Sequence, residues 1–121
     1  MQVRGLVWMG TTTRHFDETV RFFRGVMGLA VVVEEPGFVA LELRDTSLVE
    51  VFAPDSPHAK HHEGRPVVGF LVDDVAAART ELAAAGVELI GEIEVSEDFS
   101  WQYFRGPDGN LYEVTCGPYR R

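Results

Sequence analysis

Residues 67–86 read VVGFLVDDVAAARTELAAAG and carry the pattern that decides the fold. The apolar run at residues 67–72 predicts a strand, and Asp74 is a favourable helix N-cap directly after it. The alanine-rich residues 75–85 predict a helix, and Gly86 is suited to end it. This stretch therefore predicts a strand that is followed at once by a helix.

An earlier stretch of the chain repeats this strand–helix pattern. Residues 6–13 predict a strand, because they are first apolar and then β-branched. After it, apolar side chains at spacings of four, three and four residues mark one face of a helix that ends at Gly28; they are Phe16, Val20, Phe23 and Met27.

Three short strands are expected after each helix. They cover residues 29–33, 38–43 and 48–52 in the first half and residues 87–90, 100–105 and 111–116 in the second half. The sequence thus predicts an α+β fold of two tandem βαβββ modules in one domain spanning residues 1–121. Module one covers about 5–53, the linker 54–66 and module two about 67–117.

Composition narrows the class of protein. The 121 residues carry a net charge of −8, which argues against nucleic-acid binding. Cys116 is the sole cysteine, so the chain has no internal disulfide and no thiolate metal cluster. No apolar run approaches the ~20 residues of a membrane-spanning helix. The first residues also lack the apolar stretch of a secretory signal, and we expect a cytoplasmic protein without membrane contact.

Each module is too small to bury both faces of its sheet. Its single helix covers one face, so the other face must close on the second module or on another chain. A curved sheet with an open inner face forms a cleft, and we expect a homodimer to cover the remaining faces and edges.

Two segments resemble the vicinal oxygen chelate superfamily, which includes glyoxalase I, bleomycin-resistance proteins and extradiol dioxygenases. The segments are Val68-Gly-Phe-Leu-Val-Asp-Asp-Val75 and Phe104-Arg-Gly-Pro-Asp-Gly-Asn-Leu-Tyr-Glu113. The resemblance covers about residues 5–117. It implies that two modules form a U-shaped cleft, usually in a homodimer, with a divalent metal in the active members.

The resemblance also implies where metal ligands would lie. The family takes its ligands from the first and last strand of each module, which here correspond to Trp8 and Glu50, and to Val67 and Glu113. Because tryptophan and valine do not bind divalent metals, we expect no metal cofactor. If a metal does bind, Glu50 and Glu113 are its expected ligands.

Glu50 and Glu113 are the candidate catalytic residues. Each is a carboxylate in an apolar strand, at matching places in the two repeats. Facing one cleft, the pair would raise one pKa and provide a general base or a cation-binding site. The alternative is a solvated strand face, or an arginine partner such as Arg4 or Arg105.

Four further residues are candidates for ligand binding. Trp8 and Val67 would line the cleft where the family has ligands, and Trp101 and Tyr103 share a strand face suited to stacking on a flat molecule. Packing in the core or in a dimer interface is the alternative for the aromatic residues.

Two loops complete the expectations. The linker histidines His58, His61 and His62 are expected to be solvated, or to hold metal adventitiously. The acidic residues 92–98 are expected to form a mobile loop that could act as a lid.

Three functions remain open from the sequence. The first is metal-independent binding of a small organic molecule, as in the bleomycin-resistance branch. The second is a lyase, isomerase or dioxygenase that depends on Glu50 and Glu113, with or without a metal. The third is a non-catalytic partner or regulatory domain in which the cleft is vestigial.

Overall fold

The computed structural model describes residues 1–119, which divide into two compact units. One unit holds Trp8–Val67, and the other combines Met1–Val7 with Val68–Tyr119. Strand β1 (Gly5–Thr12) contributes residues to both, and the first residue of β5 (Val67–Leu71) belongs to the first unit while the rest of that strand belongs to the second. We call them the Trp8–Val67 unit and the C-terminal unit and describe each by itself.

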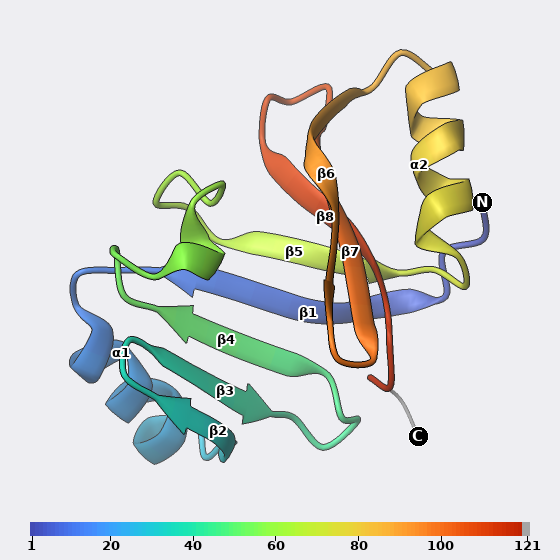
Figure 1. Cartoon of the computed structure of the whole chain (residues 1–121). Helices are drawn as coiled ribbons and strands as arrows, with labels where there is room; N and C mark the ends of the chain where they lie inside the picture. Colours follow the sequence, from blue (N-terminus) through green and yellow to red (C-terminus); the bar gives the residue numbers. More distant parts are fainter. Residues whose placement is uncertain (120–121) are drawn as a thin grey trace. The chain divides into compact units, whose positions relative to one another are not determined.

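The Trp8–Val67 unit contains a four-stranded sheet, a helical segment after its first strand and a short 3-10 helix after its last strand (Figure 1). Its strands lie in the order β2-β3-β4-β1, with β1 parallel to β4 and the other pairs antiparallel. After β1 its elements are α1 (Phe16–Arg21), η1 (Phe22–Val26), β2 (Ala30–Glu35), β3 (Phe38–Glu42), β4 (Leu48–Phe52) and η2 (Pro57–Ala59).

The core of this unit lies on the face of the sheet that α1 covers. Its buried side chains alternate along β3 and β4, namely Val39, Leu41, Val49 and Val51. Phe16, Val20 and Phe23 pack against them, as the sequence spacing predicts. No α-helix covers the opposite face, which we call the helix-free face; it holds the residues in between and is contacted by His58 of the short 3-10 helix η2.

The C-terminal unit repeats this arrangement. Its strands lie in the order β5-β8-β7-β6, with β5 parallel to β8. Its elements are β5 (Val67–Leu71), α2 (Val75–Ala84), β6 (Glu88–Ser96), β7 (Phe99–Arg105) and β8 (Leu111–Cys116). The Asp74 side chain accepts a hydrogen bond from the Ala77 amide at 3.0 Å, which confirms the predicted N-cap.

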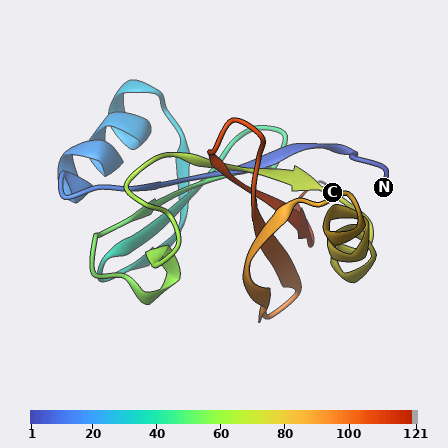
Figure 2. The same cartoon turned by 90° about the horizontal axis from the view of Figure 1, so that it is seen from above.

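Helix α2 lies along one side of the β6, β7 and β8 strands (Figure 2). Val75 and Ala78 pack there against Val114 of β8 and Val72. The N-terminal residues belong to the same unit: the Arg4 amide donates to the Leu71 carbonyl at 2.8 Å, and the terminal ammonium group pairs with Glu81. In residues 1–119, no helix is long and apolar enough to cross a membrane.

The first helix differs from the predicted one. A continuous helix to Met27 was expected, but α1 ends at Arg21 and η1 continues as a π-helix. The Met27 amide bonds the Phe22 carbonyl, five residues back, which widens the turn. Met27 lies just beyond η1 and is mostly exposed, so the predicted helix face does not continue to it.

The predicted lid is also wrong. Strand β6 runs from Glu88 to Ser96, so only Glu97 and Asp98 form a turn before β7. The ladder continues because the register shifts between Ile90 and Glu94, where Gly91 adopts a φ of 71°. Sequence alternation alone misses such a shift, since it interrupts the period of two.

Candidate functional site

In the Trp8–Val67 unit, Glu50 lies at the centre of the helix-free face. The strand register pairs it with Gly10 of β1 and with Ala40 of β3. Paired residues point to the same side of a sheet, so a carboxylate stands between two small residues. This arrangement leaves room above the strands for a large side chain beside Glu50.

The indole of Trp8 fills that room. Its ring lies over Gly10, where an added Cβ would stand 2.3 Å from the ring atom Cη2. Its Nε1 donates a hydrogen bond to Glu50 Oε1 at 2.7 Å, and the side chain is only 6% exposed. The Glu50 carboxyl group is therefore hydrogen-bonded by the indole N–H of Trp8. Trp8 occupies the position where the resemblance implied a metal ligand.

The linker folds back onto the same face through His62. This residue is 1% exposed, and its Nδ1 lies 3.1 Å from Thr12 Oγ1. Its ring meets the Trp8 ring at 6.0 Å and the Phe52 ring at 5.1 Å, both edge-on. The expectation of a solvated linker is wrong for His62, because apolar rings bury it.

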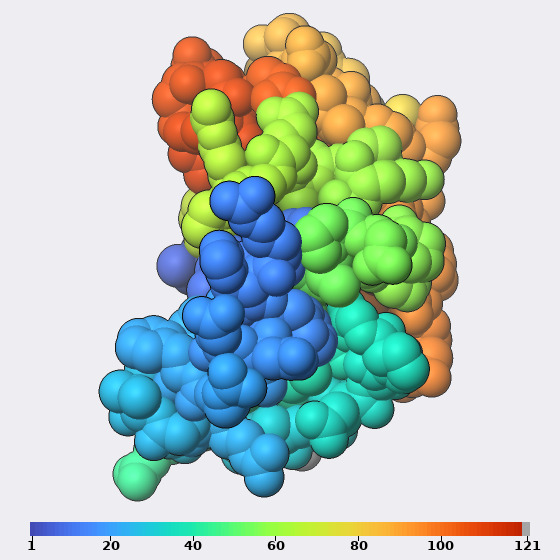
Figure 3. All heavy atoms as spheres, turned by 90° about the vertical axis from the view of Figure 1, so that its left-hand side faces the viewer, coloured from blue at the N-terminus to red at the C-terminus, as the bar shows by residue number. Residues whose placement is uncertain are grey.

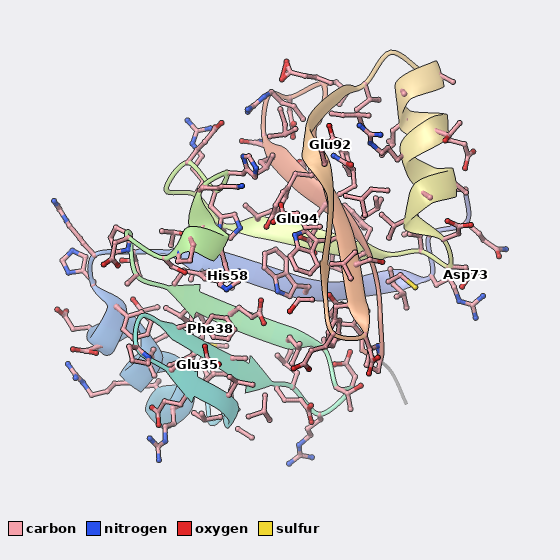
Figure 4. The ribbon with its side chains drawn as sticks, viewed as in Figure 1. Glu35, Phe38, His58, Asp73, Glu92 and Glu94 are labelled. Atoms are coloured by element: carbon pink, nitrogen blue, oxygen red, sulfur yellow. The ribbon has the colours of Figure 1, made fainter. Side chains whose placement is uncertain are left out.

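The outer linker histidine behaves differently from His62. His58 is exposed, and its ring lies 6.3 Å from the Phe38 ring at the start of β3 (Figure 4). The expected solvated position is therefore confirmed for His58.

Burial shifts the pKa of both ionisable groups in this cluster. Loss of solvent raises the pKa of Glu50 above its ordinary value, and the hydrogen bond from Trp8 partly opposes that rise. Burial, aided by the nearby His61, lowers the pKa of His62 to about 4. His62 is therefore neutral at physiological pH and acts as a polar member of the core.

The donor set does not fit the divalent metal that the resemblance implied. Trp8 and Val67 offer no metal-binding atom, and Glu50 Oε1 already accepts the indole N–H. Across residues 1–119, no three His, Cys, Asp or Glu side chains are placed to hold one ion.

The C-terminal unit carries a related polar and aromatic face. Glu113 of β8 pairs with Gly69 of β5 and with Tyr103 of β7, as Glu50 pairs with two neighbours in the first module. Glu113 is 3% exposed and Tyr103 is also buried. In the next row Trp101 stands opposite Thr115, on the same side of the sheet.

The register confirms that the parallel inner strands of the two modules, β1 and β4 in one and β5 and β8 in the other, match residue by residue. Trp8 lies opposite Leu48, and the pair Val68–Tyr112 places Val67 level with Leu111, the matching residue. Val67 is fully buried, but it is too short to cover Gly69 as Trp8 covers Gly10. Glu50 and Glu113 belong to different units, so their meeting in one cleft stays a prediction.

The sequence analysis did not place two residues, His62 and Glu94, on the helix-free faces. The signal for His62 was its place in a histidine-rich linker only five residues before β5. Glu94 was assigned to a loop, although the register pairs it with Trp101 across β6 and β7. Neither contact follows from local pattern, because both depend on how distant segments pair.

A cavity of about 450 Å³ lies elsewhere on the Trp8–Val67 unit, beside α1 and the β2–β3 hairpin. Its rim includes four carboxylates, namely Asp17, Glu34, Glu35 and Asp55. Figure 3 views the chain from the side on which α1 and this hairpin are visible. None of the predicted site residues lines this cavity.

Comparison with known proteins agrees with this repeated architecture. The family model for the Glyoxalase/Bleomycin resistance protein/Dioxygenase superfamily matches residues 5–114. The chain belongs to this superfamily. This match confirms the family and the fold that were expected from the sequence. A search of curated protein sequences found no match to the chain.

Solved structures with the same fold are distant in sequence. A superfamily member from Vibrio splendidus 12B01 is 21% identical, with a TM-score of 0.68 and 95% of this chain and 99% of that chain covered. The Mn(II)-bound glyoxalase from Novosphingobium aromaticivorans is 23% identical, with a TM-score of 0.78, and the match covers 99% of this chain and 42% of that chain.

Another similar structure is methylmalonyl-CoA epimerase from Mycobacterium tuberculosis. It is 22% identical, with a TM-score of 0.74, and the match covers 95% of this chain and 89% of that chain. At these identities the likeness shows the fold alone, and the chemistry must be argued from this chain's own residues.

Proposed function

We propose that this superfamily member binds a small organic molecule without a metal, on the helix-free faces of its two modules. The observation that carries the proposal is the hydrogen bond from Trp8 to Glu50. It places an aromatic donor where a metal ligand would otherwise stand. The aromatic side chains Trp101 and Tyr103 support it, because they offer flat apolar surface beside polar groups.

The proposed ligand is neutral or cationic. The net charge of −8, the half-buried carboxyl group of Glu50 and the buried carboxyl group of Glu113 disfavour an anion. In this proposal the protein is a homodimer that binds and sequesters the ligand.

Native mass spectrometry of the purified protein tests this proposal. We expect a bound organic molecule, or saturable binding of a compound from a screened library, that persists after treatment with a chelator. Stoichiometric zinc, nickel, iron or manganese that depends on both Glu50 and Glu113 would contradict metal-independent binding.

A second candidate function is acid–base catalysis by Glu50. The raised pKa of its carboxyl group favours this role, since a general base works best with a pKa close to the working pH. Turnover of a bound compound that Glu50→Gln abolishes, while binding persists, would favour the lyase or isomerase over simple binding.

A further inference from the structure

The helix-free face of the C-terminal unit carries two buried polar atoms that lack a hydrogen-bond partner in residues 1–119. They are the carboxylate oxygen Glu94 Oε2 on β6 and the indole nitrogen Trp101 Nε1 on β7. A buried donor or acceptor without a partner costs free energy, and proteins usually satisfy such atoms. An orphaned acceptor and an orphaned donor on one face therefore need an explanation.

The two side chains are direct neighbours across the sheet. The register pairs Glu94 with Trp101, and Trp101 in turn with Thr115 of β8. All three therefore point to the side away from α2. As whole side chains Glu94 and Trp101 are only partly buried, although the two unpaired atoms themselves lie beneath the surface.

A register shift in β6 brings Glu94 to this position. Between the Ile90–Tyr103 pair and the Glu94–Trp101 pair, β6 advances by two more residues than β7. Without this shift Glu92 would oppose Trp101, but Glu92 is instead mostly exposed, 3.5 Å from Arg79 (Figure 4).

Buried Gln102 holds the shifted segment of β6. Its Nε2 donates to the carbonyl oxygens of Ile90 and Gly91 at 3.2 and 3.1 Å. Hydrogen bonds from the buried Gln102 side chain therefore stabilise this bulge.

We infer that Glu94 and Trp101, on the helix-free face of the C-terminal unit, together bind one ligand group. That group offers an N–H donor to Glu94 Oε2 and a carbonyl oxygen to Trp101 Nε1. The inference rests on the proposed function and names the chemistry of its ligand. An indole N–H is a donor only, and an ionised carboxylate is an acceptor only. A carboxamide or lactam supplies both partners, whereas an anionic acceptor is disfavoured by the adjacent carboxylate.

The test uses small benzene derivatives as probes and reads the two indole N–H signals by nuclear magnetic resonance. Benzamide has both groups, N,N-dimethylbenzamide lacks the N–H, and benzoate is an anion. The chain has only two tryptophans, and Trp101→Phe assigns the signals. The Trp8 indole is an internal reference, because it already donates to Glu50.

We expect benzamide to shift the Trp101 signal saturably at millimolar concentration and to leave the Trp8 signal in place. Glu94→Leu should weaken benzamide binding about ten-fold and leave N,N-dimethylbenzamide binding unchanged. Glu92→Leu makes the same replacement two residues away on the exposed strand position and should have no effect. If Glu94→Leu does not fold, Glu94→Gln should weaken the cation benzamidine more than it weakens benzamide.

Any of three results with these probes would overturn the inference. They are the absence of a Trp101 shift, an equal shift of both indoles, and an equal loss of every probe in Glu94→Leu. A library compound that binds without moving the Trp101 signal would preserve the proposed function and refute this inference. Failure of all library compounds, with benzamide bound as described, would instead refute the proposed function of sequestering a larger molecule.

Discussion

Gly10 controls the position of the Trp8 indole. An added Cβ would come within 2.3 Å of that ring and within 3.3 Å of Phe52. We predict that Gly10→Ala displaces the ring, breaks its hydrogen bond to Glu50 and lowers the free energy of unfolding by about 1–3 kcal/mol. Chemical denaturation followed by tryptophan fluorescence measures both effects in a Trp101→Phe background.

Gly25 provides the matched control for that prediction. A Cβ at Gly25 would meet no atom within 4 Å, so Gly25→Ala should leave stability unchanged or slightly higher. Equal stability losses in the two variants would contradict a specific role for Gly10.

Glu50 is predicted to reduce stability when it is ionised. Burial raises its pKa in the folded state above the ordinary value of 4.5, so folding favours the protonated form. The contribution of Glu50 to the free energy of unfolding is most favourable below pH 4.5. It is lost as the pH rises through the pKa of the folded state. Glu50→Gln should therefore be more stable than the parent near neutral pH and lose this advantage near pH 4, as thermal unfolding across pH would measure.

Glu50→Gln removes the ionisable group of Glu50 and keeps the hydrogen bond from Trp8. Glutamine keeps an oxygen that can accept the indole N–H. A stability advantage that is independent of pH would contradict the assignment to Glu50 ionisation.

His62 is predicted to act in the opposite direction. Burial lowers its pKa from 6.5 to about 4, so its contribution to stability is complete above pH 6.5. It is lost as the pH falls towards 4, by roughly 3 kcal/mol in total. His62→Gln has no proton to bind and should flatten the stability profile in this window.

The exposed His58 offers the control in the same linker. His58→Gln should reproduce the parent's stability profile between pH 4 and 6.5. A flattened profile in His58→Gln, or an unchanged profile in His62→Gln, would show that His62 is not the responsible group.

At the scale of the elements, the strands that follow simple patterns were predictable. Leu48–Phe52 and Leu111–Cys116 have the predicted bounds, because alternation and turn residues define both ends. The π-helix η1 and the long β6 were not predictable, since each departs from the regular period.

The candidate site was predictable only where it repeats between modules. The matching places of Glu50 and Glu113 in the two halves identified both residues, and the register confirms their equivalence. His62 and Glu94 were missed because their neighbours come from other strands, at distances in sequence that no local period reports.

Gln102 is predicted to stabilise the shifted register of β6. Its Nε2 lies within hydrogen-bond distance of the carbonyl oxygens of Ile90, Gly91 and Tyr103, and the side chain is fully buried. Gln102→Leu removes this donor and should lower the free energy of unfolding by about 1–3 kcal/mol. Urea denaturation measures the loss, and the exposed Gln2→Leu should change it by less than about 0.5 kcal/mol.

At the scale of the whole molecule, half of the exposed large apolar residues in the described part of the chain lie on η1, at Met27 directly after it, and on β2. Phe22, Val26 and Met27 are 49–76% exposed, and Val32 and Val33 of β2 are 48% and 40% exposed. β2 is also an edge strand, which presents unpaired backbone groups. Exposed apolar surface beside an unpaired edge strand is typical of an interface, and the homodimer proposed above would place a second copy of the chain on it.

We therefore predict a homodimer of about 27 kDa, twice the chain mass of 13.5 kDa, in light scattering at tens of micromolar. In a two-fold symmetric contact each substitution occurs twice, so Val26→Asp places two charges in the interface and should yield monomers with unchanged circular dichroism. Val95 of β6 is comparably exposed, at 70% against 76% for Val26, and Val95→Asp should leave the dimer intact. A monomeric parent protein would contradict the dimer, and dissociation by Val95→Asp alone would move the interface to the C-terminal unit.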